Sequence, residues 1–246
     1  TKEQAPTWKR AVRATSGSLG DPLGQVYVKK YFPPESKRRM TELVGNLKVA
    51  LREDLDKLEW MSDATRKQAL EKLEAFSAKI GYPDKWKDYS KLDVDRGAYA
   101  TNAMRARHFA FTRDIAKVNK PVDKDEWGYG PQTVNASYNP FTNNITFPAG
   151  ILQPPFFDPE ADPASNYGAI GYVIGHEITH GFDLSGSQFG PTGNFEDWWR
   201  PEDRQRFLAL NEELAAQYDA IEVAPGLFVD GQITVGENAA DLGGVQ

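Results

Sequence analysis

The sequence predicts a mainly α-helical chain with a small β-sheet, an α+β fold. The first observation is a stripe of leucines at three- and four-residue intervals, which is typical of an amphipathic helix. The second is a pair of short runs, Gln132–Tyr138 and Asn144–Pro148, that have the composition of two strands joined by a polar turn. The leucines of the stripe are Leu43, Leu47, Leu51, Leu55 and Leu58.

The N-terminal third is expected to be helical. Residues 1–21 are mixed and polar and indicate only the end of an element, whereas residues 23–80 have a charged, helical pattern. Ser62 is a suitable N-cap for a second helix, which places Ala69, Leu73 and Phe76 on one face. The many charged residues between them are interpreted as the solvated face of a helical pair.

A cluster of helix-breaking residues, Gly81-Tyr82-Pro83-Asp84, indicates a boundary. We therefore divide the chain into residues 1–80, a linker and part of an enclosing helical domain, and residues 81–246, a partial catalytic domain. A helix over about 95–118 carries His108, which is interpreted as a surface residue rather than a metal ligand.

The rest of the chain alternates between loops and helices. Trp198 and Trp199 are expected to open a charged helix and to anchor it in the core. The predicted elements are an apolar loop over 148–157, a helix over 166–182, a glycine-rich loop over 181–194, a helix from Trp198 to Tyr218, a hairpin over 228–233 and a helix over 235–244.

Composition limits the possible functions. The chain has 246 residues, a formal net charge of −6 and 40% hydrophobic residues, which favours a globular protein and argues against a nucleic-acid partner. No apolar run is long enough to span a membrane, and no signal peptide is visible. The absence of cysteine excludes disulfides and thiolate metal ligands, so a metal would need histidine and carboxylate ligands.

The motif His176-Glu177-Ile178-Thr179-His180 carries the functional prediction. Only three histidines occur in the chain, and two of them stand four residues apart. On a helix, both imidazoles share one face and can reach one ion, with Glu177 beside them. Taken alone, such a motif has a substantial false-positive rate.

A catalytic zinc site takes three protein ligands and keeps one position open. No further histidine follows His180 closely, so a glutamate from a later helix is required, and Glu237 is the best candidate. Asp241, four residues on, is placed to accept the ring N–H of a ligand histidine, and Asp183 is a candidate for the same role. We expect one Zn²⁺ per chain, with Glu177 taking a proton from the zinc-bound water.

Four segments carry a family resemblance. They are Val134–Tyr138, Ile145–Phe157, Val173–Asp183 and Gly236–Asp241, and they resemble, in this order, the neprilysin-like zinc peptidases, which include the endothelin-converting enzymes and bacterial PepO oligopeptidases. The similarity extends weakly upstream through Trp60-Met61 and residues 80–84.

The resemblance implies a thermolysin-like zincin core and a zinc-dependent endopeptidase that cleaves short oligopeptides. It implies that His176, His180 and Glu237 bind zinc and that Glu177 is catalytic, with Asp241 supporting a histidine. It places Asn135 and Ala136 on an edge strand that holds the substrate backbone. The residues implied to line an apolar pocket for a substrate side chain are Ile151, Phe156 and Val173.

Two departures from the family pattern shape the remaining expectations. Ala11 stands where mammalian members have a cysteine, which favours a bacterial, secreted or periplasmic protein. The chain stops soon after Glu237, and the family's later histidine, which stabilises the transition state, has no counterpart in it. We therefore expect a fragment, either one half of a split or nicked enzyme with a complementing polypeptide, or a truncated chain. Two alternatives stay open: a different zincin with the same ligands, and a non-catalytic fragment that binds zinc and peptide.

Overall fold

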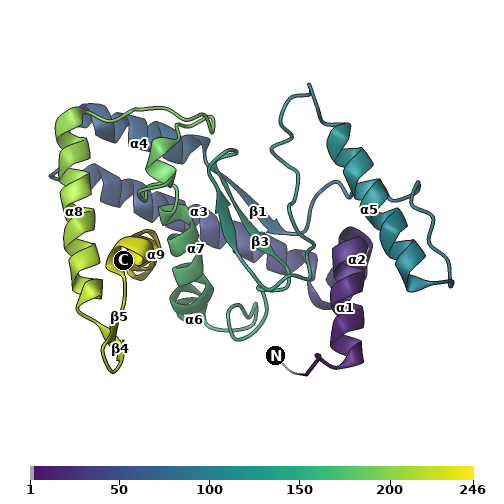
Figure 1. The fold of residues 1–246 in the computed structure, drawn as a ribbon. Coiled ribbons are helices and arrows are strands. Elements are labelled where there is room, and N and C mark those ends of the chain that lie inside the picture. The colour runs from purple at the N-terminus through teal and green to yellow at the C-terminus, as the bar shows by residue number, and fades with distance from the viewer. Residues whose placement is uncertain (1–2) are drawn as a thin grey trace.

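The computed structural model describes residues 3–246 and confirms the predicted fold class, which is mainly α with a small sheet (Figure 1). The helices are α1 (Thr7–Ser18), α2 (Gly20–Tyr31), α3 (Pro34–Lys57), α4 (Asp63–Ala75), α5 (Tyr99–Ile115), α6 (Pro163–Asn166), α7 (Tyr172–Thr179), α8 (Pro201–Asp219) and α9 (Gly231–Val245), with a π-helix at Tyr167–Gly171 and a 3₁₀ turn at Gly186–Gln188. The strands are β1 (Ser77–Gly81), β2 (Ser137–Asn139), β3 (Asn144–Pro148), β4 (Glu222–Ala224) and β5 (Leu227–Phe228).

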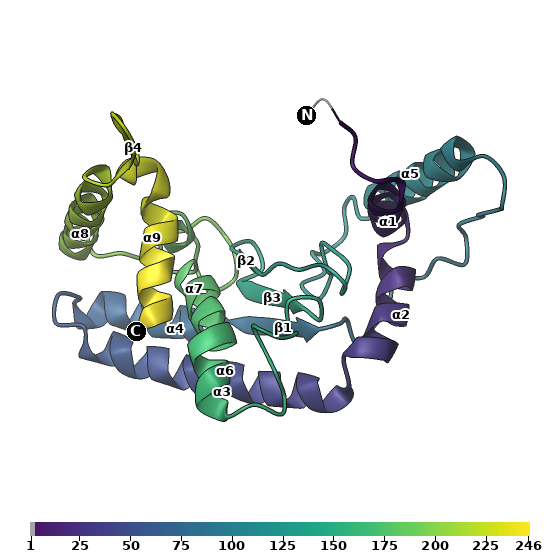
Figure 2. The same ribbon diagram turned by 90° about the horizontal axis from the view of Figure 1, so that it is seen from below.

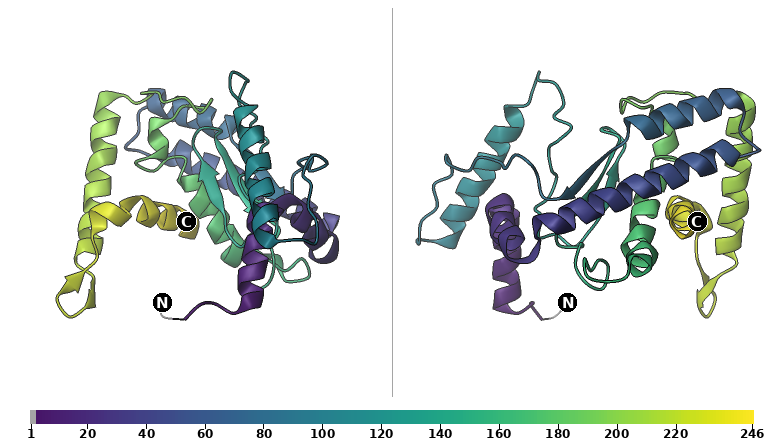
Figure 3. Two further views of the ribbon diagram at one scale, coloured as in Figure 1. Left: turned by 45° about the vertical axis from the view of Figure 1, so that its right-hand side comes forward. Right: turned by 180° about the vertical axis from the view of Figure 1, so that it is seen from behind.

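The long helix α3 connects the two ends of the molecule. Figures 1 and 2 show α1, α2 and α5 at one end, α8 and α9 at the other, and the three-stranded sheet between them. The view from behind in Figure 3 shows α3 running past the sheet, from beside the N-terminal helices to the end of the molecule that holds α8. The expected leucine stripe lies on this helix, and Leu43 and Leu55 are buried in the core.

The sheet combines distant parts of the chain in the order β1-β3-β2. Strand β3 is buried along its whole length, pairs in parallel with β1 and antiparallel with β2, and leaves β2 at an edge. The expectation of a helix over residues 77–80 is wrong: they form strand β1, because pairing with β3 decides their conformation. The boundary expected after residue 80 stays a prediction, but β1 crosses that position and joins both sides in one sheet.

The N-terminal helices differ from expectation at their ends. Residues 7–18 form a complete helix, α1, where the sequence indicated only the end of an element. The Ser62 hydroxyl accepts a hydrogen bond from the Thr65 N–H at 3.5 Å, as its predicted capping role requires. Helix α5 is shorter than the expected 95–118, and His108 on it is exposed.

The C-terminal elements are also shifted. Helix α8 begins at Pro201, after Trp198 and Trp199 rather than with them, and both indoles are buried in the core as expected. The hairpin lies at β4 and β5 rather than over 228–233, because Gly226 supplies the positive φ of the turn. Helix α9 starts at Gly231, where Asp230 caps it by accepting a hydrogen bond from the Ile233 N–H at 3.1 Å.

One hydrophobic core joins elements that are distant along the chain. Its buried side chains come from α3, α4, β1, β3 and α7, together with Trp198 and Trp199. The residues of the motif therefore stand on a helix that packs against both the sheet and the α3–α4 pair.

Among residues 3–246 no helix is long and apolar enough to cross a lipid bilayer.

Candidate metal centre

The motif lies on α7, the last part of a helical stretch that begins at Pro163. Asp162 caps this stretch by accepting a hydrogen bond from the Ala164 N–H at 2.8 Å. The stretch passes through a π-helix before α7, and such irregular turns are frequent at functional sites. It ends at Thr179 rather than at the expected Phe182.

Three ligand atoms converge at one point. The Nε2 atoms of His176 and His180 are 3.0 Å apart, and Oε2 of Glu237 lies 3.4 Å from the first and 3.5 Å from the second. Tetrahedral zinc with bonds of about 2.0–2.1 Å requires ligand atoms about 3.3 Å apart. The two imidazoles and the carboxylate therefore have the chemistry and the spacing that a zinc ion requires.

Two carboxylates orient the imidazole rings. Nδ1 of His176 lies 2.8 Å from Oδ1 of Asp241, and Nδ1 of His180 lies 2.7 Å from Oδ2 of Asp183. A proton on each Nδ1 leaves both Nε2 atoms free to bind a metal. Burial disfavours the charged form of His180, but Asp183, followed by the charges of Glu237 and Glu177, raises its pKa overall.

Glu237 reaches the histidines because α9 packs very closely on α7. Glycines face one another at this crossing: a Cβ added to Gly175 would lie 3.0 Å from Cα of Gly244, and one added to Gly244 would lie 2.6 Å from the Tyr172 carbonyl oxygen. Glu237 and Asp241 share the face of α9 that points at the motif, since they are four residues apart. The Glu237 side chain is 68% exposed, so the candidate site opens to solvent on this side.

Glu177 points away from solvent. It is buried on α7, and this burial raises its pKa, against the opposing effects of His180, His176 and the Tyr138 backbone N–H. Tyr138 belongs to β2, so the carboxyl lies between the histidine pair and the sheet edge. A carboxylate with a raised pKa accepts and releases a proton more readily near neutral pH.

The residues implied to hold a substrate are placed differently from one another. Asn135 and Ala136 lie just before β2 rather than within it, and their role in holding a substrate backbone stays a prediction. In the β2–β3 register the residue opposite Asn135 would be Pro148, which has no backbone N–H to donate. The three expected pocket residues range from buried Ile151 through half-buried Val173 to exposed Phe156, and their shared role stays a prediction.

Two protein-family sequence models, both described as peptidase family M13, match the chain, one over residues 1–83 and the other over residues 135–246. The chain belongs to peptidase family M13. This membership confirms the resemblance to neprilysin-like enzymes and excludes the alternative of an unrelated zincin.

Relatives of this M13 chain are much longer. Neprilysin of Oryctolagus cuniculus is 37% identical over 255 residues, which are 100% of this chain and 34% of the relative. The structure of Mycobacterium tuberculosis zinc metalloprotease ZMP1 with an inhibitor is 48% identical, with a TM-score of 0.92, and the match covers 99% of this chain and 38% of that one. The structure of PepO from Lactobacillus rhamnosis is 37% identical with a TM-score of 0.89, and the match covers 98% of this chain and 39% of that one. The chain thus spans about a third of the curated relative's length.

Two residues around the candidate site were not predicted from the sequence. The Tyr172 hydroxyl donates to Asp241, and this bond raises the tyrosine pKa to about 12. Its position, four residues before His176, was a usable signal. The second is Lys72 on α4, which donates to the carbonyl oxygen of Gly181, next to His180. Lys72 interrupts the apolar face of Ala69, Leu73 and Phe76. A lysine within an apolar helix face is the sequence feature that could have indicated a buried, hydrogen-bonded cation.

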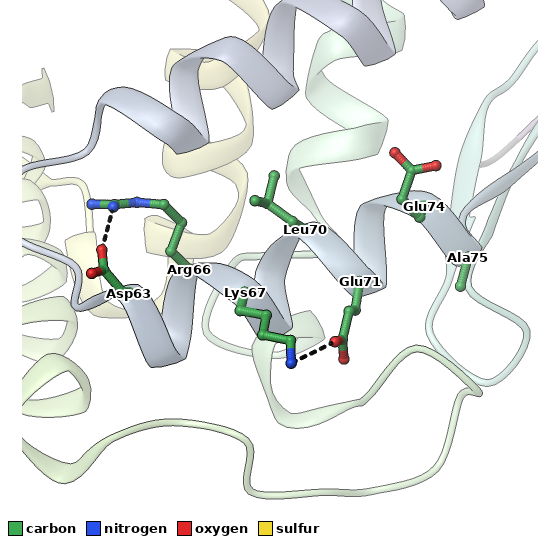
Figure 4. Close-up of a pocket in the computed structure, with 7 residues that line it drawn as sticks. All are labelled: Asp63, Arg66, Lys67, Leu70, Glu71, Glu74 and Ala75. Atoms are coloured by element: carbon green, nitrogen blue, oxygen red, sulfur yellow. Dashed lines mark hydrogen bonds and ion pairs between the residues drawn. The ribbon is translucent and has the colours of Figure 1, made fainter.

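Two surface pockets lie away from the candidate metal-ligand atoms of His176, His180 and Glu237. One, of about 1090 Å³, lies between α3, α7, α8 and α9, and Gly175 and Ile178 reach it from a different face of α7 than the histidines. The other lies over the outer face of α4, where Lys67 pairs with Glu71 and Arg66 with Asp63 (Figure 4). Because these surface charges neutralise one another, we assign no function to the second pocket.

Proposed function

We propose that this chain is the zinc-binding part of an endopeptidase that hydrolyses the peptide bonds of short oligopeptides. The observation that carries the proposal is the convergence of His176 Nε2, His180 Nε2 and Glu237 Oε2 beside the buried Glu177. One zinc ion per chain would be held by these three groups. When bound, zinc supplies a Lewis acid that polarises a carbonyl and lowers the pKa of water at its open position.

The chain's own residues perform the proton transfers in this proposal. Glu177 takes a proton from the attacking water and passes it to the nitrogen of the leaving amine. Its raised pKa suits both steps. Asp183 and Asp241 keep the two rings oriented throughout, because each accepts a hydrogen bond at Nδ1.

Strand β2 is the proposed binding edge for the peptide. One side of β2 pairs with β3, and the other has no strand beside it in the sheet of residues 3–246. An extended peptide could add there through main-chain hydrogen bonds, with Asn135 and Ala136 continuing the contact. Ile151, Phe156 and Val173 are proposed to contact the substrate side chain.

Residues outside this chain, carried by a further segment or polypeptide, are proposed to complete the site. We also propose that the protein acts outside the cytoplasm.

Cleavage of a fluorescence-quenched peptide tests the proposal. Zinc-loaded chain and its Glu177→Gln variant are compared, each with and without a chelator, and zinc content is measured in parallel. We expect chelator-sensitive cleavage that falls about 10²–10⁴-fold in the variant, while zinc content is unchanged. Zinc binding without any turnover would favour a non-catalytic fragment that binds zinc and peptide, and retained activity in the variant would exclude Glu177 as the base.

A further inference from the structure

Lys72 of α4 is a buried cation with three backbone partners. Its side chain is 1% exposed, and Nζ donates to the carbonyl oxygens of Gly181 at 2.6 Å, Gly186 at 2.7 Å and Phe189 at 2.7 Å. All three carbonyls belong to the loop that follows the metal-binding helix. A buried charge is costly unless it is well hydrogen-bonded, so this arrangement requires an explanation.

The protons of Lys72 match its acceptors. Burial lowers the pKa of the ammonium group to about 8, with the charge of Asp183 opposing the change. Most of the side chain is therefore protonated at pH 7, and an ammonium group has three N–H donors for the three carbonyls. Loss of the side chain would remove this partner from the Gly181 and Phe189 carbonyl oxygens, while that of Gly186 would still accept from the Phe189 N–H at 3.0 Å.

The loop that Lys72 holds is the loop that carries Asp183. Oδ1 of Asp183 accepts hydrogen bonds from the N–H groups of Ser185 at 2.8 Å and Gly186 at 2.7 Å, and Oδ2 faces His180. Gly186 thus donates to Asp183 through its N–H and accepts from Lys72 through its carbonyl. The orientation of the Asp183 carboxylate is fixed by a turn whose backbone is fastened to Lys72.

Lys72 is also connected to the sheet edge. Its backbone carbonyl accepts a hydrogen bond from Nδ2 of Asn143 at 2.9 Å, and Oδ1 of Asn143 accepts one from the Tyr138 hydroxyl at 3.0 Å. Asn143 has a φ of 49°, in the turn between β2 and β3. One residue of α4 therefore contacts both the loop behind His180 and the turn that positions β2.

We propose that Lys72 is a positioning residue of the metal centre, which fastens the loop over residues 181–189 so that Asp183 orients His180. The inference rests on the proposed zinc site, because it assigns Lys72 an effect on zinc affinity. It also predicts an effect on the loop itself that needs no metal. The effect should pass through Asp183, which separates it from a general loss of stability.

Zinc affinity, measured by competition with a chromophoric chelator at pH 7, tests the inference in a double-mutant cycle. The variants are Lys72→Met, Asp183→Asn and the double substitution. Lys72→Met alone should weaken zinc binding by about 10–100-fold, as expected when an orienting partner is lost. In the Asp183→Asn background the same substitution should change affinity by less than about threefold, because coupled residues are non-additive.

The matched control is Lys67→Met on the same helix. The Lys67 side chain is 75% exposed and pairs with Glu71, one turn along the same helix (Figure 4). Its replacement should therefore change zinc affinity by no more than about twofold. Amide hydrogen exchange in the metal-free protein should become faster over 181–189 in Lys72→Met and stay unchanged in Lys67→Met. If Lys72→Met does not fold, Lys72→Gln, which retains two N–H donors, replaces it in the cycle.

Four results would overturn the inference. The first is that the Lys72 variant binds zinc as tightly as Lys67→Met. The second is that the Lys72 substitution weakens zinc binding equally in the presence and absence of Asp183. Unchanged hydrogen exchange over 181–189 would contradict the role in the loop. Failure of the unsubstituted chain to bind zinc would overturn the proposed function, and this inference with it, and is recognised before any variant is made.

Discussion

Asp241 lies one helical turn beyond Glu237 on α9, with its Oδ1 atom 2.8 Å from Nδ1 of His176. One helix thus supplies both a candidate ligand and the group that orients another. The Tyr172 hydroxyl donates to the same oxygen, and this bond raises the tyrosine pKa to about 12.

We expect Asp241→Asn to weaken zinc binding by about 10–100-fold, because the amide is a poorer acceptor for the ring N–H. Tyr172→Phe should have a smaller effect in the same direction. Chelator competition measures both, with Asp56→Asn on the exposed side of α3 as the control. Equal affinities of the Asp241 and Asp56 variants would argue against the orienting role.

Glu237→Ala should abolish stable zinc binding while leaving the fold intact. The side chain is 68% exposed, so its removal creates no cavity, but one of three ligands is lost. The loss of affinity should exceed the about 10–100-fold typical of an orienting partner. Elemental analysis after dialysis gives the zinc content, and Glu212→Ala, an exposed glutamate of α8, is the matched control. Full zinc content in the Glu237 variant would remove it from the ligand set.

Gly244→Ala should move α9 away from α7. The added Cβ would lie 2.6 Å from the Tyr172 carbonyl oxygen, and a backbone atom cannot move aside easily. We expect a loss of about 1–3 kcal/mol in the free energy of unfolding, together with weaker zinc binding. Gly45→Ala on α3 is the control, since its Cβ meets nothing within 4 Å and should stabilise the helix by about 0.5–1 kcal/mol. Equal zinc affinity in both variants would show that the close crossing is not required.

Asp203→Asn should lower stability in a pH-dependent way. The buried carboxylate accepts hydrogen bonds from the Ser62 N–H and hydroxyl. Burial alone would raise its pKa, but these bonds and others outweigh burial and lower it. Its contribution, about 1.5–3 kcal/mol, is therefore complete above the ordinary carboxyl pKa of about 3.9 and is lost as pH falls through the lower folded value.

Chemical unfolding at pH 7 and at low pH measures this contribution. The difference between the unsubstituted chain and Asp203→Asn should shrink as the pH falls. Glu202→Gln, at an exposed neighbouring position, should change stability by no more than about 0.5 kcal/mol. A difference that is constant with pH would mean that the carboxylate charge contributes nothing.

Local chemistry made much of the candidate site predictable. The pair His176 and His180 follows from spacing on one helix, and Asp183 lies within the next turn. Glu237 could be named because a chain without cysteine and with few histidines leaves only carboxylates as a third ligand. The structure brings these groups together, and their roles stay predictions until a metal is measured.

Contacts between distant segments were not predictable. Ser77–Gly81 follows α4 without a helix breaker before Gly81, and only its pairing with β3 makes it a strand. The partners of Lys72 could not be predicted for the same reason, since its acceptors are more than a hundred positions away along the chain. The pattern of an isolated segment does not contain the partner that decides its structure.

The pairing of β1 with β3 makes the two matched segments depend on each other. β1 lies within the first segment matched to the family, and β3 lies within the second. Either segment produced alone would present an unpaired strand edge, which is a template for aggregation. Each matched segment supplies one strand of this pair, so neither can form the parallel part of the sheet without the other.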